Sequence, residues 1–117
     1  EDLASRDLGR WMASHAAARD PAVRPIIMGI GLAPVYYAHG TMRYLPYGNE
    51  AAALNYVRRM RPDYVVLREF ELKQVPYGAA WLERGIDDAC AKPVVPLPTT
   101  ATTRSRMWRW DCHDAPR

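Results

Sequence analysis

Two glycines one residue apart, Gly29 and Gly31, directly follow the apolar run 26–28, as glycines do at the start of a dinucleotide-binding turn. In that turn the backbone holds a pyrophosphate at the N-terminus of a helix. The third glycine of the fingerprint would stand where the chain has Pro34, and the acidic residue expected about 20 residues further on is missing. The glycines are better explained by a tight exit from a strand, and nucleotide binding stays the alternative.

The hydroxyl, imidazole and carboxylate side chains do not form a recognisable catalytic or metal-binding pattern. The three histidines lie in three different predicted elements, and nothing specifies that one of them meets Ser5, Ser14 or Ser105. The run 111–114 (Asp-Cys-His-Asp) contains metal-ligand types, but consecutive residues of an extended strand point to opposite faces. We therefore expect no catalytic residue, no metal and no cofactor in this domain.

The two cysteines, Cys90 and Cys112, have a more informative spacing. They lie equally far from Ala101, and Ala101 itself lies in a polar stretch that is typical of a hairpin loop. In a hairpin centred there, the two thiols would lie on opposed strand positions at a separation that suits a disulfide. Closing such a loop stabilises a fold by about 3 kcal/mol in the chain-entropy model. We favour the disulfide, and two free thiols stay the alternative for a reducing compartment.

Clusters of arginine and tryptophan raise the question of nucleic acid or lipid headgroups as partners. Arg58, Arg59 and Arg61 crowd the end of a predicted helix, where the helix dipole favours cations. In residues 106–110 (RMWRW) the two tryptophans share one face of a strand, which indicates that they cover the sheet or a helix and belong to the core. The chain has a net charge of +3 with acidic residues spread along it, so we expect no nucleic-acid partner.

The elements that must position these residues alternate between helices and strands. Helical spacing of apolar residues and short apolar runs predict, in chain order, a helix over 7–17, a strand over 26–28, a helix over 34–39, a strand over 41–45, a helix over 49–60, a strand over 64–67, a helix over 76–85, and hairpin strands over 92–97 and 106–110. Strands joined by such helices usually lie parallel. We therefore expect one α/β domain over residues 1–117, a three-layer α/β/α sandwich with a small, mainly parallel, Rossmann-like sheet and a C-terminal antiparallel hairpin.

Cap and turn residues support these boundaries. Asn49 is expected to cap the helix over 49–60 through its side chain. Gly40 and Gly85 are expected in the positions that end the two helices before them. Pro34 suits the first turn of its short helix.

A ligand site in such a sheet is expected at the carboxyl ends of its parallel strands. The residues at that edge are Gly29, Gly31, Tyr47, Arg68 and Glu69. Arg68 and Glu69 directly follow an apolar strand and would meet a polar group of a ligand. A surface ion pair at a strand exit is the alternative.

Five segments, covering most of the chain, share the character of one known kind of domain. They are DLGRWMA, IIMGIGLAPVYYAHG, TMRYLPYG, PDYVVLRE and MWRW. Together they resemble the C-terminal soluble domain of polytopic glycosyltransferases of the GT-C type, the lipid-phosphosugar-dependent protein-mannosyltransferase and aminoarabinose-transferase class.

The resemblance implies a division of labour. In that class the catalytic carboxylates lie in loops of the membrane-embedded portion, which would use a lipid-phosphate-sugar donor and a divalent metal. The C-terminal domain would then be a non-catalytic accessory module on the extracytoplasmic, periplasmic side of the membrane. Its partners would be the transmembrane portion of the same chain, the membrane surface or an acceptor substrate.

The sequence leaves two other functions open. Because it begins at Glu1 without an initiator methionine, we expect it to be a fragment, and the resemblance implies that the larger protein is a membrane protein. The first alternative is a freestanding Rossmann-like module that binds a small molecule or nucleotide. The second, weaker alternative is a basic nucleic-acid-binding domain.

Overall fold

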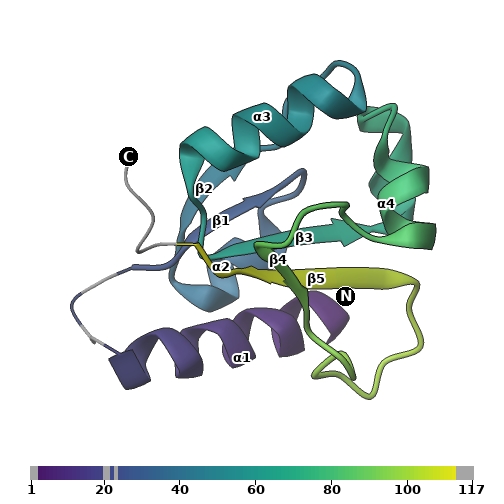
Figure 1. The fold of residues 1–117 in the computed structure, drawn as a ribbon. Coiled ribbons are helices and arrows are strands. Elements are labelled where there is room, and N and C mark those ends of the chain that lie inside the picture. Colours follow the sequence, from purple (N-terminus) through teal and green to yellow (C-terminus); the bar gives the residue numbers. More distant parts are fainter. Residues whose placement is uncertain (1–2, 20–21, 23, 113–117) are drawn as a thin grey trace.

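The computed structural model describes residues 3–19, 22 and 24–112 of the chain, and Figure 1 shows its fold. The elements are α1 (Leu3–Arg19), β1 (Ile26–Gly29), α2 (Ala33–Ala38), β2 (Thr41–Tyr44), α3 (Glu50–Met60), β3 (Tyr64–Arg68), the 3-10 helix η1 (Glu69–Gln74), α4 (Gly78–Arg84), β4 (Ala91–Pro93) and β5 (Ser105–Trp110). The order matches the predicted alternation of helices and strands. Only η1 has no counterpart in the prediction.

The five strands form one mixed sheet in the order β2-β1-β3-β5-β4. Strand β1 pairs in parallel with β2 and β3, whereas β5 pairs antiparallel with both β3 and β4. The prediction of a mainly parallel sheet is therefore wrong. The physical reason for the difference is the position of β5. This strand lies between β3 and the short edge strand β4, so antiparallel pairing extends to the centre of the sheet.

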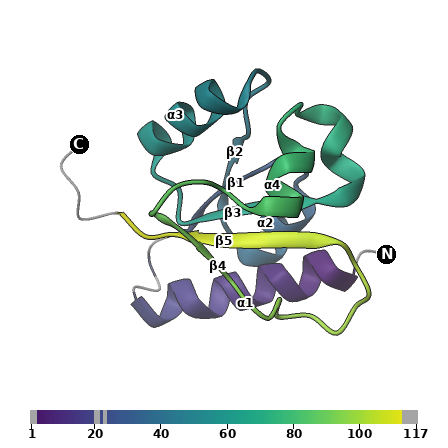
Figure 2. The same ribbon diagram turned by 45° about the vertical axis from the view of Figure 1, so that its right-hand side comes forward.

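Helices lie on both faces of this sheet, as Figures 1 and 2 show from two directions. On one face, α1 and α2 bury a cluster with Ile27, Tyr64, Val66 and Met107. On the other face, α3 and α4 pack on a larger cluster that contains Met28, Val65, Leu67, Trp81, Trp108 and Trp110. Strand β3 supplies residues to both clusters and is buried along its whole length, which explains its continuous apolar sequence. The prediction that Trp108 and Trp110 belong to the core is confirmed, since each is 1% exposed.

The helix ends follow their local chemistry, with one correction. The Asn49 side chain accepts from the backbone N–H of Ala52 at 2.8 Å, which confirms it as the cap of α3. After α2, however, the left-handed residue is His39, with φ 53°, and not Gly40. Gly40 is needed for space instead, because a Cβ there would lie 2.8 Å from both the Pro25 carbonyl and the Ile27 side chain.

The hairpin differs in detail from its prediction. Strand β4 ends at Pro93, so the predicted strand over 92–97 is short and the connection to β5 is long. Ala91 pairs with Trp110, which shifts the register by one residue from a hairpin centred on Ala101. Cys90 therefore lies opposite Asp111, whose N–H donates to the Cys90 carbonyl at 2.8 Å. Cys90 and Cys112 nevertheless form a disulfide with a Cα–Cα distance of 5.4 Å. This is possible because strand β5 ends at Trp110, so the chain after it is free of the ladder and brings Cys112 to Cys90.

Gly9 sets the distance between α1 and α2. A Cβ built at Gly9 would lie 2.5 Å from the Tyr37 Cβ and 2.6 Å from the Pro34 carbonyl oxygen, which belong to α2. Gly9→Ala should therefore lower the free energy of unfolding by about 1–3 kcal/mol through overpacking, although alanine is the better helix former. Urea unfolding measures this change, with Ser14→Ala on the exposed side of α1 as the control. Equal or greater stability of Gly9→Ala would contradict the close packing.

Tyr77 makes the stability of the fold depend on alkaline pH. Its phenol donates to the Pro46 carbonyl at 2.6 Å, and burial raises the pKa of this phenol above its ordinary value of about 10. The unfolded chain loses the proton at lower pH than the folded chain. The free energy of unfolding therefore falls as the pH rises above about 10. Tyr77→Phe should make that fall less steep in urea titrations at a series of alkaline pH values, and an unchanged slope would exclude this role.

Within residues 3–19, 22 and 24–112, no helix combines the length and apolar character that crossing a membrane requires.

Candidate functional site

The carboxyl ends of β1 and β3, where the sequence predicts a ligand, are closely packed. A Cβ at Gly31 would lie 2.6 Å from the Glu71 carboxylate and would also clash with the Arg68 guanidinium. Gly31 and Arg68 are therefore brought together as predicted, but side chains fill the space between them. Gly29 is buried at the end of β1, and a Cβ there would lie 3.1 Å from the carbonyl oxygen of Val66 in β3.

A buried ion pair occupies this edge. Arg68 is 5% exposed and Glu71 is 4% exposed, and their side chains meet at 2.6 Å between Nη2 and Oε2. The other Glu71 oxygen accepts from the Arg68 backbone N–H at 3.2 Å, while Arg68 Nη1 donates to the Ser5 hydroxyl of α1. The Arg68 guanidinium lies 4.5 Å from the centre of the exposed Phe70 ring. These contacts tie η1 and α1 to the end of β3.

The other two residues of the predicted edge face solvent. Glu69 pairs with Arg104 at 3.0 Å, and both side chains are about half exposed. This is the surface ion pair that the sequence leaves as the alternative for this strand exit. Tyr47 is 82% exposed in the turn after β2.

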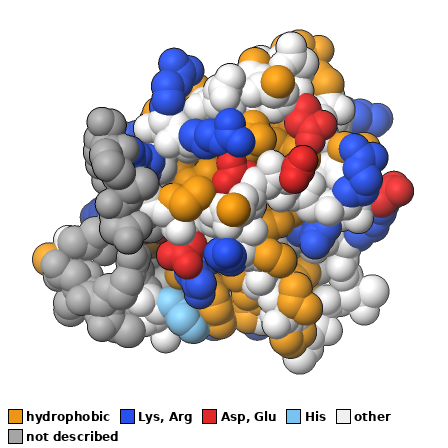
Figure 3. All heavy atoms as spheres, viewed as in Figure 1, with side chains coloured by type: hydrophobic (Ala, Val, Ile, Leu, Met, Phe, Trp, Pro, Cys, Tyr) orange, Lys and Arg blue, Asp and Glu red, His pale blue; other side chains and the backbone are white. Residues whose placement is uncertain are grey.

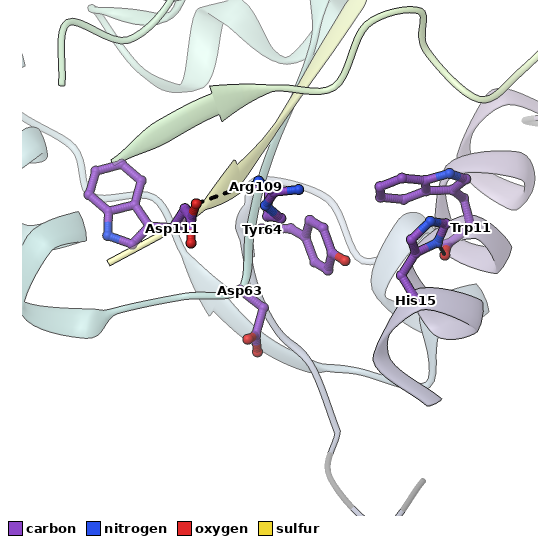
Figure 4. Close-up of a pocket in the computed structure, with 7 residues that line it drawn as sticks. Trp11, His15, Asp63, Tyr64, Arg109 and Asp111 are labelled. Atoms are coloured by element: carbon purple, nitrogen blue, oxygen red, sulfur yellow. Dashed lines mark hydrogen bonds and ion pairs between the residues drawn. The ribbon is translucent and has the colours of Figure 1, made fainter. Parts of the chain in front are cut away.

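A pocket lies at the opposite end of the sheet, where β3 begins and β5 ends. It has a volume of about 410 Å³, and we call it the α1–β5 pocket. Its lining residues are Trp11, His15, Asp63, Tyr64, Arg109, Trp110 and Asp111. Figure 4 shows Trp11 and His15 reaching in from α1, with Tyr64 and Arg109 between them and Asp111. On the face shown in Figure 3, a histidine lies beside hydrophobic surface with basic and acidic side chains next to it.

Three rings make one wall of the α1–β5 pocket. Trp11 and His15 are one helical turn apart on α1, and their rings stack with centroids 3.7 Å apart. The Tyr64 ring meets Trp11 edge to face at 5.8 Å. His15 Nδ1 lies 2.8 Å from the Trp11 carbonyl, which can only accept, so Nδ1 carries a proton and Nε2 of the neutral ring is an acceptor. The wall is thus held by contacts within α1 and across to β3.

Charged side chains make the rest of the lining. Asp63 Oδ2 accepts from the backbone N–H of Ile26 at 2.7 Å, and the Asp63 carbonyl accepts from Trp110 N–H at 2.9 Å. Asp63 therefore joins the starts of β1 and β3 to the end of β5. Arg109 and Asp111 approach each other to 3.5 Å, and both side chains are more than half exposed. The lining of the pocket thus contains two carboxylates and one guanidinium in addition to the three rings.

Two further candidates from the sequence, Ser105 and Arg58, have structural contacts. Ser105 exchanges a hydrogen bond with Thr103 at 3.0 Å, and Arg58 pairs with Asp88 at 2.6 Å. Of the run 111–114, His113 and Asp114 lie outside the described residues. Over the part of the chain that the structure describes, no group of three or more histidine, cysteine, aspartate or glutamate side chains is arranged to hold a metal ion.

Comparison of the chain with protein-family models, curated proteins and solved structures finds no match.

Sequence reasoning did not identify the α1–β5 pocket as a site. Trp11 and His15 belong to the helix predicted over 7–17, and Asp111 belongs to the run 111–114, which was set aside as a metal site. The signal that would reveal the pocket is the pairing of β3 with β5. Antiparallel pairing places the residue before one strand, Asp63, beside the last residue of the other, Trp110.

Proposed function

We propose that this chain is a non-catalytic, extracytoplasmic accessory domain of a membrane glycosyltransferase that uses a lipid-phosphate-sugar donor. The observation that carries the proposal is the Cys90–Cys112 disulfide. Disulfides persist in oxidising compartments such as the periplasm and are rare in the cytosol. A periplasmic location agrees with the class of domain that the sequence resembles.

The position of the resembling segments gives further support. Three of them supply β1, α2, β2 and β3, which form one contiguous parallel block of the sheet. Helices on both faces of the sheet also support a three-layer, Rossmann-like arrangement for the domain. We assign sugar transfer, the lipid-phosphate-sugar donor and any divalent metal to the membrane-embedded portion.

A surface on α2 and β2 suits contact with that portion. Leu32 is 57% exposed and Tyr36 is 75% exposed, and with Met42 they border a shallow hollow of about 410 Å³. Exposed apolar surface next to a hollow is typical of an interaction site. Arg24 and His39 also line this hollow and would suit the polar margin of such a contact.

Two measurements test the proposal. The gene should encode, before Glu1, several hydrophobic spans of about 20 residues each. In the full chain, Tyr36→Asp should reduce sugar transfer to an acceptor, whereas Val95→Asp, at a position 78% exposed in the hairpin connection, should not. A polar upstream region, or sugar transfer by the isolated domain, would contradict the proposal.

The alternative of a nucleotide-binding module is disfavoured by one observation. In the strand order β2-β1-β3, such a ligand would bind at the carboxyl ends of β1 and β3. Arg68 and Glu71 fill the space next to Gly31 there. A panel of nucleotides should therefore leave the melting temperature unchanged, whereas a bound nucleotide at about 100 times its Kd would add about 2.7 kcal/mol of stability.

A further inference from the structure

We propose that the α1–β5 pocket binds a neutral saccharide unit. The site is separate from the predicted edge at Gly31 and from the α2–β2 surface. The inference goes beyond the accessory function, because the domain would bind sugar by itself whether or not it belongs to a glycosyltransferase.

The size and position of the pocket suit a small ligand. Its volume of about 410 Å³ falls within the range of about 300–1,000 Å³ that is usual for small-molecule sites. Regular elements hold its walls, because Trp11 and His15 lie on α1, and Tyr64 and Arg109 are directly paired residues of β3 and β5. A site on paired strands and a helix is held more precisely than one on loops.

The ring wall provides an apolar surface for the C–H groups of a sugar ring. The Trp11–His15 stack and the edge contact with Tyr64 fix the three rings relative to one another. His15 is exposed and Trp11 is only partly buried, so the stack still presents ring surface outward. A rigid aromatic wall gives contact area at small cost in conformational entropy.

The charged lining determines the class of ligand. Arg109 and Asp111 bear opposite charges and pair with each other, and the Asp63 carboxylate already accepts from the Ile26 backbone N–H. A lining whose charges are already paired favours a neutral ligand over an ionic one. Carboxylate oxygens accept from sugar hydroxyls, and the guanidinium donates to sugar oxygens, through charge-assisted hydrogen bonds. A neutral polyhydroxylated ring offers both donors and acceptors to the exposed Arg109–Asp111 pair.

The Arg109–Asp111 contact adds little to the stability of the fold. The two side chains lie 3.5 Å apart and both are more than half exposed, and solvent screens ion pairs of this kind. Its two side chains can therefore turn to a ligand at small cost. They can also be replaced without unfolding the domain, which makes them suitable for testing.

The test is a titration of the disulfide-bonded chain with methyl glycosides of glucose, galactose, mannose and N-acetylglucosamine, followed in ¹H–¹⁵N spectra. We expect at least one glycoside to shift the indole N–H signals of Trp11 and Trp110 and the backbone signals of Tyr64 and Arg109 in a saturable way. Trp108 and Trp81, which do not line the pocket, should not shift. Inorganic phosphate and ethylamine serve as anionic and cationic probes and should not compete.

Two variants and a matched control complete the experiment. Arg109→Gln and Asp111→Asn should each weaken glycoside binding about tenfold, which corresponds to the loss of one charge-assisted hydrogen bond. Arg104→Gln removes a similarly exposed arginine from an ion pair with Glu69 at the opposite end of the sheet and should leave binding unchanged.

Three outcomes would overturn the proposal. They are the absence of a saturable shift with every glycoside, shifts that map outside the pocket, or displacement of the glycoside by phosphate or ethylamine. If a variant fails to fold, the map of shifts in the unaltered chain still decides the question.

Discussion

Replacing Arg68 by methionine is expected to lower the free energy of unfolding by about 3–5 kcal/mol. The substitution leaves the Glu71 carboxylate, 4% exposed, without the guanidinium that it meets at 2.6 Å. Without its partner, a buried charge no longer has an attraction that offsets the free energy of its removal from water. The Ser5 hydroxyl on α1 also loses the hydrogen bond that the Arg68 guanidinium donates to it. Urea unfolding followed by circular dichroism measures the loss.

Two control variants separate burial of the charge from loss of contact area. In Arg68→Met/Glu71→Leu neither of the two buried charges remains, so much of the stability should return. Arg104→Met breaks an ion pair of which both side chains are about half exposed, and should cost less than about 1 kcal/mol. Equal effects of Arg68→Met and Arg104→Met would contradict a buried, mutually dependent pair.

The second large effect is expected from the disulfide. Cys90→Ser/Cys112→Ser should lower the free energy of unfolding by about 3 kcal/mol, because the bond closes a loop between residues 22 positions apart and restricts the unfolded chain. The bond also holds the chain that follows β5, directly after Asp111 of the α1–β5 pocket. The double variant should therefore bind glycosides less tightly as well as unfold more easily.

Reduction gives an independent control for this prediction. A thiol reductant should lower the stability of the unaltered chain by a similar amount and should have no effect on Cys90→Ser/Cys112→Ser. Two titratable thiols in unreduced protein isolated from the periplasm would show that the bond does not form there. Such a result would also remove the observation that carries the proposed function.

Much of the fold could be predicted because its signals are local. The run of apolar residues in β3, the Asn49 cap of α3 and Gly85 after α4 each act through neighbours within a few residues. The exit of β3 was harder to predict. Arg68 was expected to face a ligand, but η1 follows the strand at once and brings Glu71 back to it.

The cysteines show how a correct pairing can accompany a wrong register. The sequence placed Cys90 and Cys112 opposite each other, whereas the ladder places Cys90 opposite Asp111. Spacing along the chain brings two residues into the same neighbourhood. Spacing does not determine the exact register of the two strands. The register depends on the course of the connection between Pro93 and Ser105, which contains no regular element that spacing could predict.

The sequence by itself determined the order of helices and strands, the apolar character of β3 and the proximity of the two cysteines, because these depend on periodicity, capping and chain distance. Only the tertiary structure decided that β5 inserts between β3 and β4, and with it the mixed sheet and the α1–β5 pocket. The pairing partner of a strand depends on which apolar faces the whole chain can bury together. That choice is made between residues distant in sequence, such as Trp11, Asp63 and Arg109, and local patterns do not record it.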